Sequence, residues 1–209
     1  MVLVKSTVEE FCQILGSSAP APGGGSVAAL SGALGAELVS MVCHLSIGKA
    51  GLEEFQELLK ESLEKSQGLA KELLERVDLD TLAFNDVMAA FKMPKETEQE
   101  KSTRRDAIQS GYKVAVQSPL GIAEGCVAVL QVAEKLIGKF NTNAMSDFGV
   151  SALQAHAGLE GAIMNVRINL PSIKDEKFVA QTNKAVAALL EKGSTHKEKI
   201  YTYVQNNIG

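Results

Sequence analysis

Residues 52–91, LEEFQELLKESLEKSQGLAKELLERVDLDTLAFNDVMAAF, decide the fold of this chain of 209 residues. Apolar side chains recur along the stretch at helical spacing, from Leu52 and Leu59 to Phe91, and Glu and Lys fill the gaps. This periodicity predicts one long amphipathic helix with a solvated face. Pro94 ends the pattern, because a residue that precedes proline disfavours helical backbone angles.

The segment before this stretch predicts two further helices. Ser6-Thr-Val-Glu-Glu10 is a capping-box pattern, and it opens a short helix that ends near Leu15. Residues 16–25 form a loop rich in Pro, Gly and Ser. Ser26 is placed to cap the apolar helix that follows this loop.

The rest of the chain reads as helix after helix. No stretch alternates with a period of two between hairpin turns, and there is no internal repeat, so we predict no sheet. Long helices joined by short loops predict an all-α fold, an up-and-down bundle in a single domain over residues 1–209. The remaining helices are expected at 97–139, with a kink or break at Pro119, at 144–170, ended by Pro171, and at 174–207.

The helix after Ser26 is expected to be buried. Residues 27–47 lack Lys and Arg, which raises the question of a membrane span, but they contain Glu37 and His44. A glutamate at the bilayer centre costs on the order of a few kcal/mol, so a buried helix is the better interpretation. Small residues crowd one side of it and would let another backbone approach closely, within the subunit or across a dimer: Ala28, Ser31, Gly32, Gly35 and Ala36.

The composition of the chain argues against several classes of function. Apolar residues make up 45% of the chain and charged residues 22%, an ordinary globular balance. The net charge of −4 provides no basic field for nucleic acid. The three cysteines are widely spaced and the three histidines show no ligand spacing, which predicts free, mostly buried thiols and no metal site. The polar start of the chain shows no signal peptide, and we expect a cytoplasmic protein.

The sharpest local signal is Pro20-Ala-Pro-Gly-Gly-Gly-Ser26, which runs into a helix. Its three glycines leave backbone N–H groups uncovered, and the helix N-terminus adds partial positive charge. The segment could therefore cradle an anion or an electron-rich carbonyl. A tight loop that lets the next helix pack closely explains the same residues equally well.

The helix at 144–170 carries a polar stripe on an otherwise apolar surface. Solvent, helix–helix hydrogen bonds or a ligand could satisfy it, and a buried unpaired amide costs roughly 1–3 kcal/mol. Glycines are poor choices for an exposed helical face, which favours a cleft wall. The stripe consists of Asp147, Ser151, Gln154, Gly158, Gly161, Asn165 and Asn169.

Two weaker constellations lie on or after residues 52–91. Asp80 and Phe84 are four residues apart, so a carboxylate and a ring share one helical face, although most such aspartates are simply solvated. Basic residues cluster around Pro94, interrupted by glutamates, and they read either as a charged loop or as a dock for a polycarboxylate tail. The cluster contains Lys92, Lys95, Lys101, Arg104 and Arg105.

Several of these blocks, in their order along the chain, resemble the formimidoyl-tetrahydrofolate cyclodeaminase and methenyl-tetrahydrofolate cyclohydrolase family, which includes the C-terminal domain of formimidoyltransferase-cyclodeaminase. The matching pieces span most of the chain. They are residues 18–42, Val77-Asp-Leu-Asp-Thr-Leu-Ala-Phe84, Lys92-Met-Pro-Lys95 with Glu100, Lys101 and Arg104, Asn141, Ser146-Asp147, and Asn165-Val-Arg-Ile-Asn-Leu170.

The resemblance implies an all-α enzyme that assembles as a dimer or larger and needs no metal or organic cofactor. Its activity would be cyclisation of 5-formimidoyl-tetrahydrofolate to 5,10-methenyl-tetrahydrofolate with release of ammonia, a reaction of histidine degradation. The transferase domain is absent, and some stand-alone relatives instead hydrolyse the methenyl form to the formyl form. A helical bundle that binds folate or a protein partner without turnover is the third possibility.

The resemblance also assigns roles to residues. The family's catalytic aspartate falls on Asp80. The partner would be a reduced folate, with one or several glutamates, and neither nucleic acid nor a membrane. The residues expected to bind this substrate are Pro22, Gly23, Gly24, Gly25, Ser26, Phe84, Lys92, Lys95, Arg104, Ser146, Asp147, Asn165 and Asn169.

Overall fold

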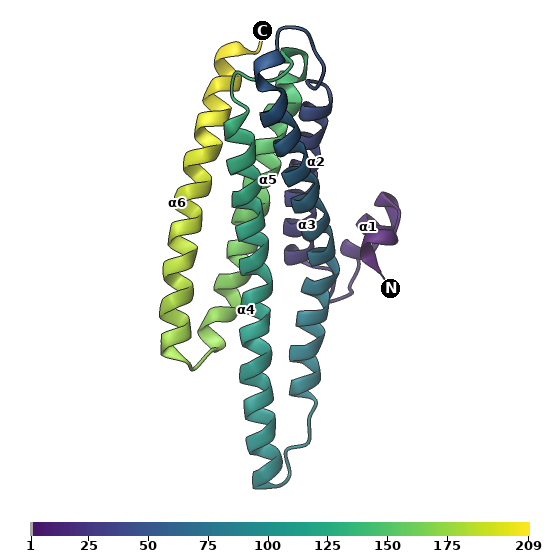
Figure 1. The fold of residues 1–209 in the computed structure, drawn as a ribbon. Helices are drawn as coiled ribbons and strands as arrows, with labels where there is room; N and C mark the ends of the chain where they lie inside the picture. Colours follow the sequence, from purple (N-terminus) through teal and green to yellow (C-terminus); the bar gives the residue numbers. More distant parts are fainter. Residues whose placement is uncertain (1) are drawn as a thin grey trace.

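The computed structural model describes residues 2–209, and every regular element in that range is a helix. This confirms the predicted all-α, up-and-down bundle (Figure 1). The α-helices are α1 (Val8–Leu15), α2 (Gly24–His44), α3 (Gln56–Phe91), α4 (Glu98–Lys135), α5 (Met145–Asn169) and α6 (Glu176–Asn207). Short 3-10 helices are η1 (Leu3–Lys5), η2 (Glu53–Phe55), η3 (Thr142–Ala144) and η4 (Leu170–Ser172).

Four helices form the centre of the bundle. Helix α2 packs against α3 and α5, and α4 packs against the same two, so the order around the bundle is α2, α3, α4, α5. Helix α6 covers α4 and α5 from outside, while α1 lies at the side of the bundle (Figure 1). This order brings the start of α2, the second half of α3 and the end of α5 to one level.

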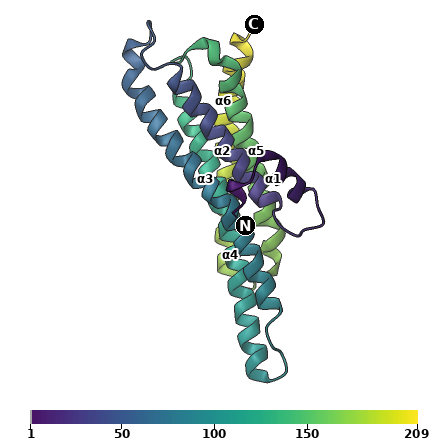
Figure 2. The same cartoon turned by 90° about the vertical axis from the view of Figure 1, so that its right-hand side faces the viewer.

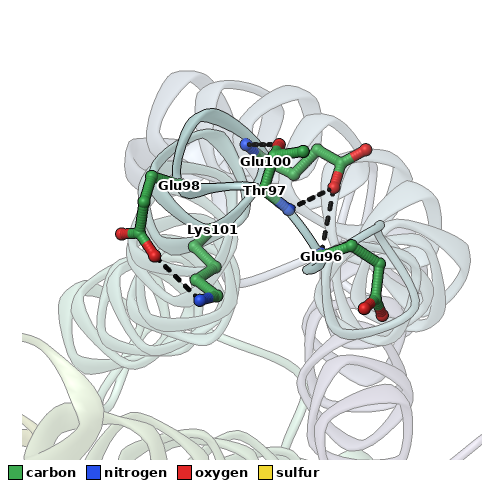
Figure 3. A network of polar contacts seen from close by, with 5 residues as sticks. All are labelled: Glu96, Thr97, Glu98, Glu100 and Lys101. Carbon is green, nitrogen blue, oxygen red and sulfur yellow. Dashed lines mark hydrogen bonds and ion pairs between the residues drawn. The ribbon is translucent and has the colours of Figure 1, made fainter.

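The hairpin formed by α3 and α4 projects beyond the other helices (Figures 1 and 2). At its tip, Thr97 and Glu100 form a reciprocal capping box that starts α4. The backbone N–H groups of Glu96 and Thr97 donate to the Glu100 carboxylate at 2.9 and 2.8 Å (Figure 3). Lys101 pairs with Glu98 at 2.8 Å, so part of the predicted basic cluster is neutralised locally.

The predicted starts of the first two helices need adjustment. The capping box of α1 is present, between Thr7 and Glu10. The prediction that Ser26 caps α2 is wrong, because α2 already begins at Gly24 with Gly23 as its N-cap. The Ser26 side chain is buried and donates to the backbone carbonyl of Val77 at 2.8 Å. Ser26 therefore ties the start of α2 to α3.

Pro119 lies inside α4, which runs through it without the predicted break. Proline has no N–H, so it cannot donate to the carbonyl four residues earlier, on Ala115. The side-chain amide of Asn169 on α5 supplies a substitute donor, at 3.4 Å from the Ala115 oxygen. A side chain of the neighbouring helix α5 thus donates a hydrogen bond to the Ala115 carbonyl, which the proline leaves without its usual backbone donor.

Helices α2 and α5 approach through the predicted small residues. A Cβ built on Gly35 would lie 2.8 Å from the Ser151 carbonyl oxygen, and one on Gly158 would lie 2.7 Å from the Ala28 carbonyl oxygen. Neither position can hold a larger residue unless the helices separate. The interface explains why this side of α2 carries glycine, alanine and serine.

Two helices, Gly24–His44 and Glu98–Lys135, have the length and mean hydropathy of a membrane span. In the most apolar window of each, 61% and 56% of the residues are buried inside the bundle. Such burial is typical of the central helices of a bundle. All three thiols are free, and burial raises the pKa of Cys43 and of Cys126 to about 12, while Cys12 is exposed.

Candidate functional site

A pocket of about 310 Å³ opens where the start of α2 meets α3, α4 and α5. It lies at the end of the α2–α5 interface, next to the projecting hairpin of α3 and α4. Seven of the predicted site residues line it together, although they come from three separate segments: Gly23, Gly24, Gly25, Asp80, Phe84, Asn165 and Asn169.

Asp80 packs directly against the glycine loop. A Cβ on Gly25 would collide with all three atoms of the Asp80 carboxyl group, so only glycine leaves room for that carboxyl at this position. Burial raises the pKa of Asp80 above its ordinary value, and a hydrogen bond from the backbone N–H of Ser26 partly opposes the rise. The site therefore contains a carboxyl group that holds its proton to higher pH than a solvated aspartate does.

The two asparagines line the same pocket from α5. The Asn165 amide donates to the Gly161 carbonyl at 2.8 Å, and a Cβ on Gly24 would come within 3.2 Å of its nitrogen. Asn169 is one turn further along and donates to the Asn165 carbonyl at 2.9 Å. Both nitrogens are thus held by backbone oxygens of the protein, which leaves the side-chain oxygens available to accept hydrogen bonds.

The other half of the pocket is apolar and aromatic. Phe84, Val87, Met88 and Phe91 follow Asp80 along one face of α3, and Phe91 lies about 16 Å from it by helix rise. Tyr112 enters from α4, and its ring meets that of Phe91 edge to face at 6.1 Å. A flat, mostly apolar ring system fits this half.

Tyr112 and Ala115 are site residues that sequence reasoning missed. They belong to α4, where the sequence shows only an amphipathic helix with a proline. The available signal was the pairing of α3 with α4 as an antiparallel hairpin, which places the first half of α4 opposite residues 80–91. To predict it, one must know which residues of α4 lie opposite which residues of α3, and hydrophobic periodicity does not give this information.

Ser146 and Asp147 are not brought to this pocket. Asp147 lies 18 residues before Asn165 on the same helix, which separates them by about 27 Å along the axis. Asp147 shares a helical face with Asn165, but a shared face says nothing about the level along the helix. The prediction that Asp147 lies in one cleft with Asn165 is therefore wrong within one chain, and Ser146, which the resemblance assigned to the substrate, lies at the same distant end of α5.

Pro22 and Ser26 adjoin the pocket without lining it. Pro22 is buried and faces a second surface hollow, beside Asp78 and Thr81. Ser26 is completely buried and holds α2 against α3. Ser26 thus positions the start of the helix that carries the glycine loop, and Pro22 lies on the other side of this loop from the pocket wall.

The predicted basic residues lie beyond Phe91. Lys92 and Lys95 are exposed on the hairpin loop. Arg104 donates to the Phe91 carbonyl at 3.1 and 3.3 Å and stacks over the Phe91 ring, 5.6 Å from its centre. None of the three lines the pocket, but Arg104 adjoins its aromatic end.

Comparison with known proteins gives the family. The family model described as Formiminotransferase-cyclodeaminase matches residues 7–188. The chain belongs to this family. A methenyltetrahydrofolate cyclohydrolase from Methylorubrum extorquens is 43% identical over 202 residues, which are 97% of both chains. The resemblance drawn from the sequence motifs is thereby confirmed.

Two further family members bear on the scaffold. A formimidoyltransferase-cyclodeaminase from Gallus gallus is 37% identical over 189 residues, which are 90% of this chain and 35% of that protein. The crystal structure of a formiminotetrahydrofolate cyclodeaminase from Thermotoga maritima has a TM-score of 0.88 at 25% identity and covers 98% of both chains. The bundle is thus the complete fold of one family member and about a third of another.

Within residues 2–209, no three or more His, Cys, Asp or Glu side chains gather where they could hold a metal ion. The chemical groups that line the pocket include the Asp80 carboxyl, whose pKa is raised by burial, the side-chain oxygens of Asn165 and Asn169, and an aromatic wall. Such a set can move a proton at a bound ring system and orient that ring by its N–H groups.

Proposed function

We propose that this chain is an enzyme that acts on the one-carbon bridge of a reduced folate, with Asp80 as the catalytic residue. The packing of the Asp80 carboxyl against Gly25 carries the proposal. In this position burial raises its pKa toward the range in which a carboxyl can both take and give a proton. Asn165 and Asn169 lie in the same pocket and can meet the pterin edge.

Hydrolysis of 5,10-methenyl-tetrahydrofolate is the reaction we favour. It is supported by the 43% identity to a cyclohydrolase over nearly the full length of both chains. Water adds to the cationic bridge carbon, and the Asp80 carboxylate takes a proton from it. One C–N bond of the bridge then breaks, Asp80 returns its proton to the departing nitrogen, and the hydroxyl loses its proton to solvent. The product is formyl-tetrahydrofolate, with one proton released overall.

Cyclodeamination, the activity that the sequence resemblance implies first, is the second candidate. It is supported by the close match of the whole bundle to a cyclodeaminase structure. The anilino nitrogen attacks the carbon of the formimidoyl group, whose imino nitrogen is protonated, and Asp80 carries the proton of the attacking nitrogen to the resulting amino group. Ammonia then leaves with the electrons of its C–N bond, and the methenyl bridge keeps the positive charge, which a carboxylate stabilises.

We place the folate along the pocket with its pterin between the glycine loop and the asparagines. Phe84 and the aromatic half then pack against the rest of the ring system. The glutamate tail leaves past Phe91 toward Arg104, Lys92 and Lys95. Neither reaction as written needs a metal or an organic cofactor, because Asp80 and solvent carry out the proton transfers.

The test supplies purified protein with each folate separately. Loss of the methenyl chromophore identifies hydrolysis, and its appearance from formimidoyl-tetrahydrofolate identifies cyclodeamination. Asp80→Asn should lower the turnover about 10²–10⁴-fold. Asp86→Asn, an exposed aspartate on the same helix, should leave it unchanged. Binding of both folates without turnover would reject the enzyme and leave a folate-binding bundle.

We also propose that the chain forms a homo-oligomer in the cytoplasm. Large apolar side chains are exposed along α2 and α5, a surface that a second copy could cover. The free thiols agree with a reducing compartment. A measured solution mass of one chain would reject the oligomer. The exposed apolar residues are Val27, Leu34, Met41, Val150, Leu153, Met164 and Ile168.

A further inference from the structure

We propose that Ser118 is a positioning residue for Asp80: its buried hydroxyl lies opposite the Asp80 carboxyl across the α3–α4 interface and donates a hydrogen bond to the carboxylate during turnover. The inference rests on the proposed function, because it concerns how the same catalytic group loses and regains its proton. Ser118 lines no part of the pocket. It acts on Asp80 from the protein side and does not touch the folate.

The first observation is the state of the Ser118 hydroxyl. It is buried and has no hydrogen-bond partner within residues 2–209. A buried serine of an α-helix can donate to a carbonyl of the preceding turn, as Ser40 does at 3.1 Å and Ser151 at 2.7 Å. Ser118 makes no such bond. Because burial of an unpaired hydroxyl is unfavourable, this serine calls for a partner outside its own helix.

The second observation is the packing two helical turns away. Leu73 of α3 lies between two glycines of the neighbouring helices. A Cβ on Gly32 of α2 would be 3.2 Å from one methyl group of Leu73, and a Cβ on Gly125 of α4 would be 2.9 Å from the other. A step of seven residues is close to two full turns, so it keeps the same side of a helix and moves about 10 Å along its axis.

Seven residues further along α3, and seven earlier on the antiparallel helices α2 and α4, stand Asp80, Gly25 and Ser118. A Cβ on Gly25 would collide with the Asp80 carboxyl, so the packing of α2 against α3 repeats at this level. The next step leads to Val87 and Gly111, and a Cβ on Gly111 would be 3.3 Å from a Val87 methyl group. Ser118 thus lies between two levels at which α4 packs directly against α3, and the side chain opposite it is Asp80.

The third step concerns the two protonation states of the carboxyl. Asp80 accepts a hydrogen bond from the backbone N–H of Ser26, and the Ser118 hydroxyl is unengaged. When Asp80 has lost its proton, both of its oxygens can accept, and a hydroxyl can rotate about its C–O bond to donate to one of them. Ser118 then stabilises the buried carboxylate, which is the form that takes a proton from water or from the anilino nitrogen.

Within residues 2–209, burial and the Ser26 N–H are what shifts the pKa of Asp80, and no charged side chain contributes. The Arg76 guanidinium, one turn away on α3, packs against Gly121 instead. Helix α2 has no titratable side chain between residues 24 and 36. The other titratable or charged groups nearest to this level are Asp78 on α3, Tyr112, Lys113 and Glu124 on α4, and Glu160 and Arg167 on α5.

The central variant is Ser118→Ala, which removes the hydroxyl and leaves every pocket residue in place. A hydrogen bond to a charged group favours the charged form about tenfold or more, so its loss should raise the pKa of Asp80 by about one pH unit. The low-pH limb of kcat/KM for the turned-over folate should move upward by the same amount. KM above this limb should stay within about twofold, because Ser118 does not contact the ligand. A purely structural serine would alter stability and leave the limb in place.

Two further variants separate the donor from the volume of the side chain. Ser118→Cys fills nearly the same space but offers only a weak donor, so its pH profile should move as that of Ser118→Ala does. Ser110→Ala alters an exposed serine of the same helix and should leave the profile unchanged. A Ser118→Cys protein with the parent profile would show that Ser118 serves packing alone and would overturn the proposal.

A titration of the protein without ligand keeps this inference separate from the proposed function. The ¹³C carboxyl resonance of Asp80, assigned by its absence in Asp80→Asn, reports the pKa directly. We expect this pKa to be about one pH unit higher in Ser118→Ala and Ser118→Cys than in the parent and unchanged in Ser110→Ala. Equal values in Ser118→Ala and the parent would reject the positioning role even in an active enzyme. A parent protein that turns over neither folate would reject the proposed function instead, whatever the titration shows.

Discussion

The α2–α5 interface is closed along its middle and open at one end, and glycine is essential to both regions for different reasons. In the closed region Gly35 and Gly158 allow the two backbones to touch. At the open end Gly24 lies against the Asn165 side chain and Gly25 against the Asp80 carboxyl, and all four residues line the pocket. The two helices lie side by side in both views of the bundle (Figures 1 and 2).

The difference lies in what an added Cβ would meet. In the closed region it meets the backbone of the opposite helix, which cannot move without separating the helices. At the open end it meets the tip of a functional side chain, which can turn away. The same residue type therefore protects stability in one region and active-site geometry in the other, and substitutions should separate these two roles.

Gly25→Ala should give the largest effect. Its Cβ would displace the Asp80 carboxyl from the pocket, and misplacement of a catalytic group by about 1 Å can cost on the order of 100-fold in rate. We expect kcat to fall about 100-fold while the melting temperature changes little, because the carboxyl can swing toward solvent. Steady-state kinetics and a thermal melt measure the two quantities. Turnover within about threefold of the parent would show that Gly25 does not position Asp80.

Gly35→Ala should show the opposite pattern. Its Cβ would lie 2.8 Å from the Ser151 oxygen and 2.9 Å from the Ala155 nitrogen. Forcing the helices apart should lower the free energy of unfolding by about 1–3 kcal/mol, with turnover per folded molecule retained. Denaturant titration measures the loss. The matched control is Gly68→Ala on α3, where no neighbour lies within 4 Å and stability should stay equal or rise.

These two regions also show how far the sequence alone could go. Small residues on one side of α2 predicted the close approach of another backbone, without saying which, and the polar stripe on α5 predicted a cleft wall. In the structure these two faces pack against each other. Within the stripe, the middle is satisfied by helix–helix contact, since Ser31 donates to the side-chain and backbone oxygens of Gln154 at 2.7 and 3.0 Å. The end at Asn165 and Asn169 opens into the pocket instead. Hydrophobic periodicity identifies which face of a helix packs against its neighbours. It does not indicate at which residue along that face the neighbouring helix ends.

The errors have the same physical origin. Asp147 shares a face with Asn165 but lies at the other end of α5. Tyr112 was missed because nothing in the sequence of α4 indicates which residues of α3 lie opposite it. A kink or a break was expected at Pro119, and α4 continues there without a break, while a side chain from a different helix donates to the carbonyl that the proline leaves without its usual partner. Each case depends on a contact between residues more than 15 positions apart or on a helix length, which a local pattern does not contain.

Asp80→Asn should show how much the buried Asp80 carboxyl lowers the stability of the parent protein as the pH rises. The pKa of Asp80 is raised in the folded chain, so from its ordinary value of 3.8 upward the folded state binds the proton more tightly than the unfolded state does. The stability that this provides is lost as pH rises through the raised pKa. Asparagine does not titrate, so the variant should gain stability relative to the parent between pH 4 and pH 8. The gain should be smaller than the loss in Gly35→Ala.

Thermal melts of both proteins across this pH range measure the effect. The informative quantity is the difference between the two melting temperatures, which removes the contribution of every other titrating group. Asp86→Asn serves as the control, because that side chain is exposed and its variant should show no such trend. A difference that stays constant from pH 4 to pH 8 would mean that Asp80 is as well solvated as an ordinary aspartate.

Gly24→Ala should have the smallest effect, because its added Cβ meets neither the opposite backbone nor the Asp80 carboxyl. Gly24 is exposed, and its Cβ would approach only the Asn165 side-chain nitrogen, at 3.2 Å, which can shift by a few tenths of an ångström. We expect KM to change by about threefold or less, with kcat and melting temperature unaltered. Kinetics in parallel with Gly25→Ala test this. An equal loss of kcat in both variants would mean that the loop acts through its backbone as a whole, whereas a loss confined to Gly25→Ala assigns it to the contact with Asp80.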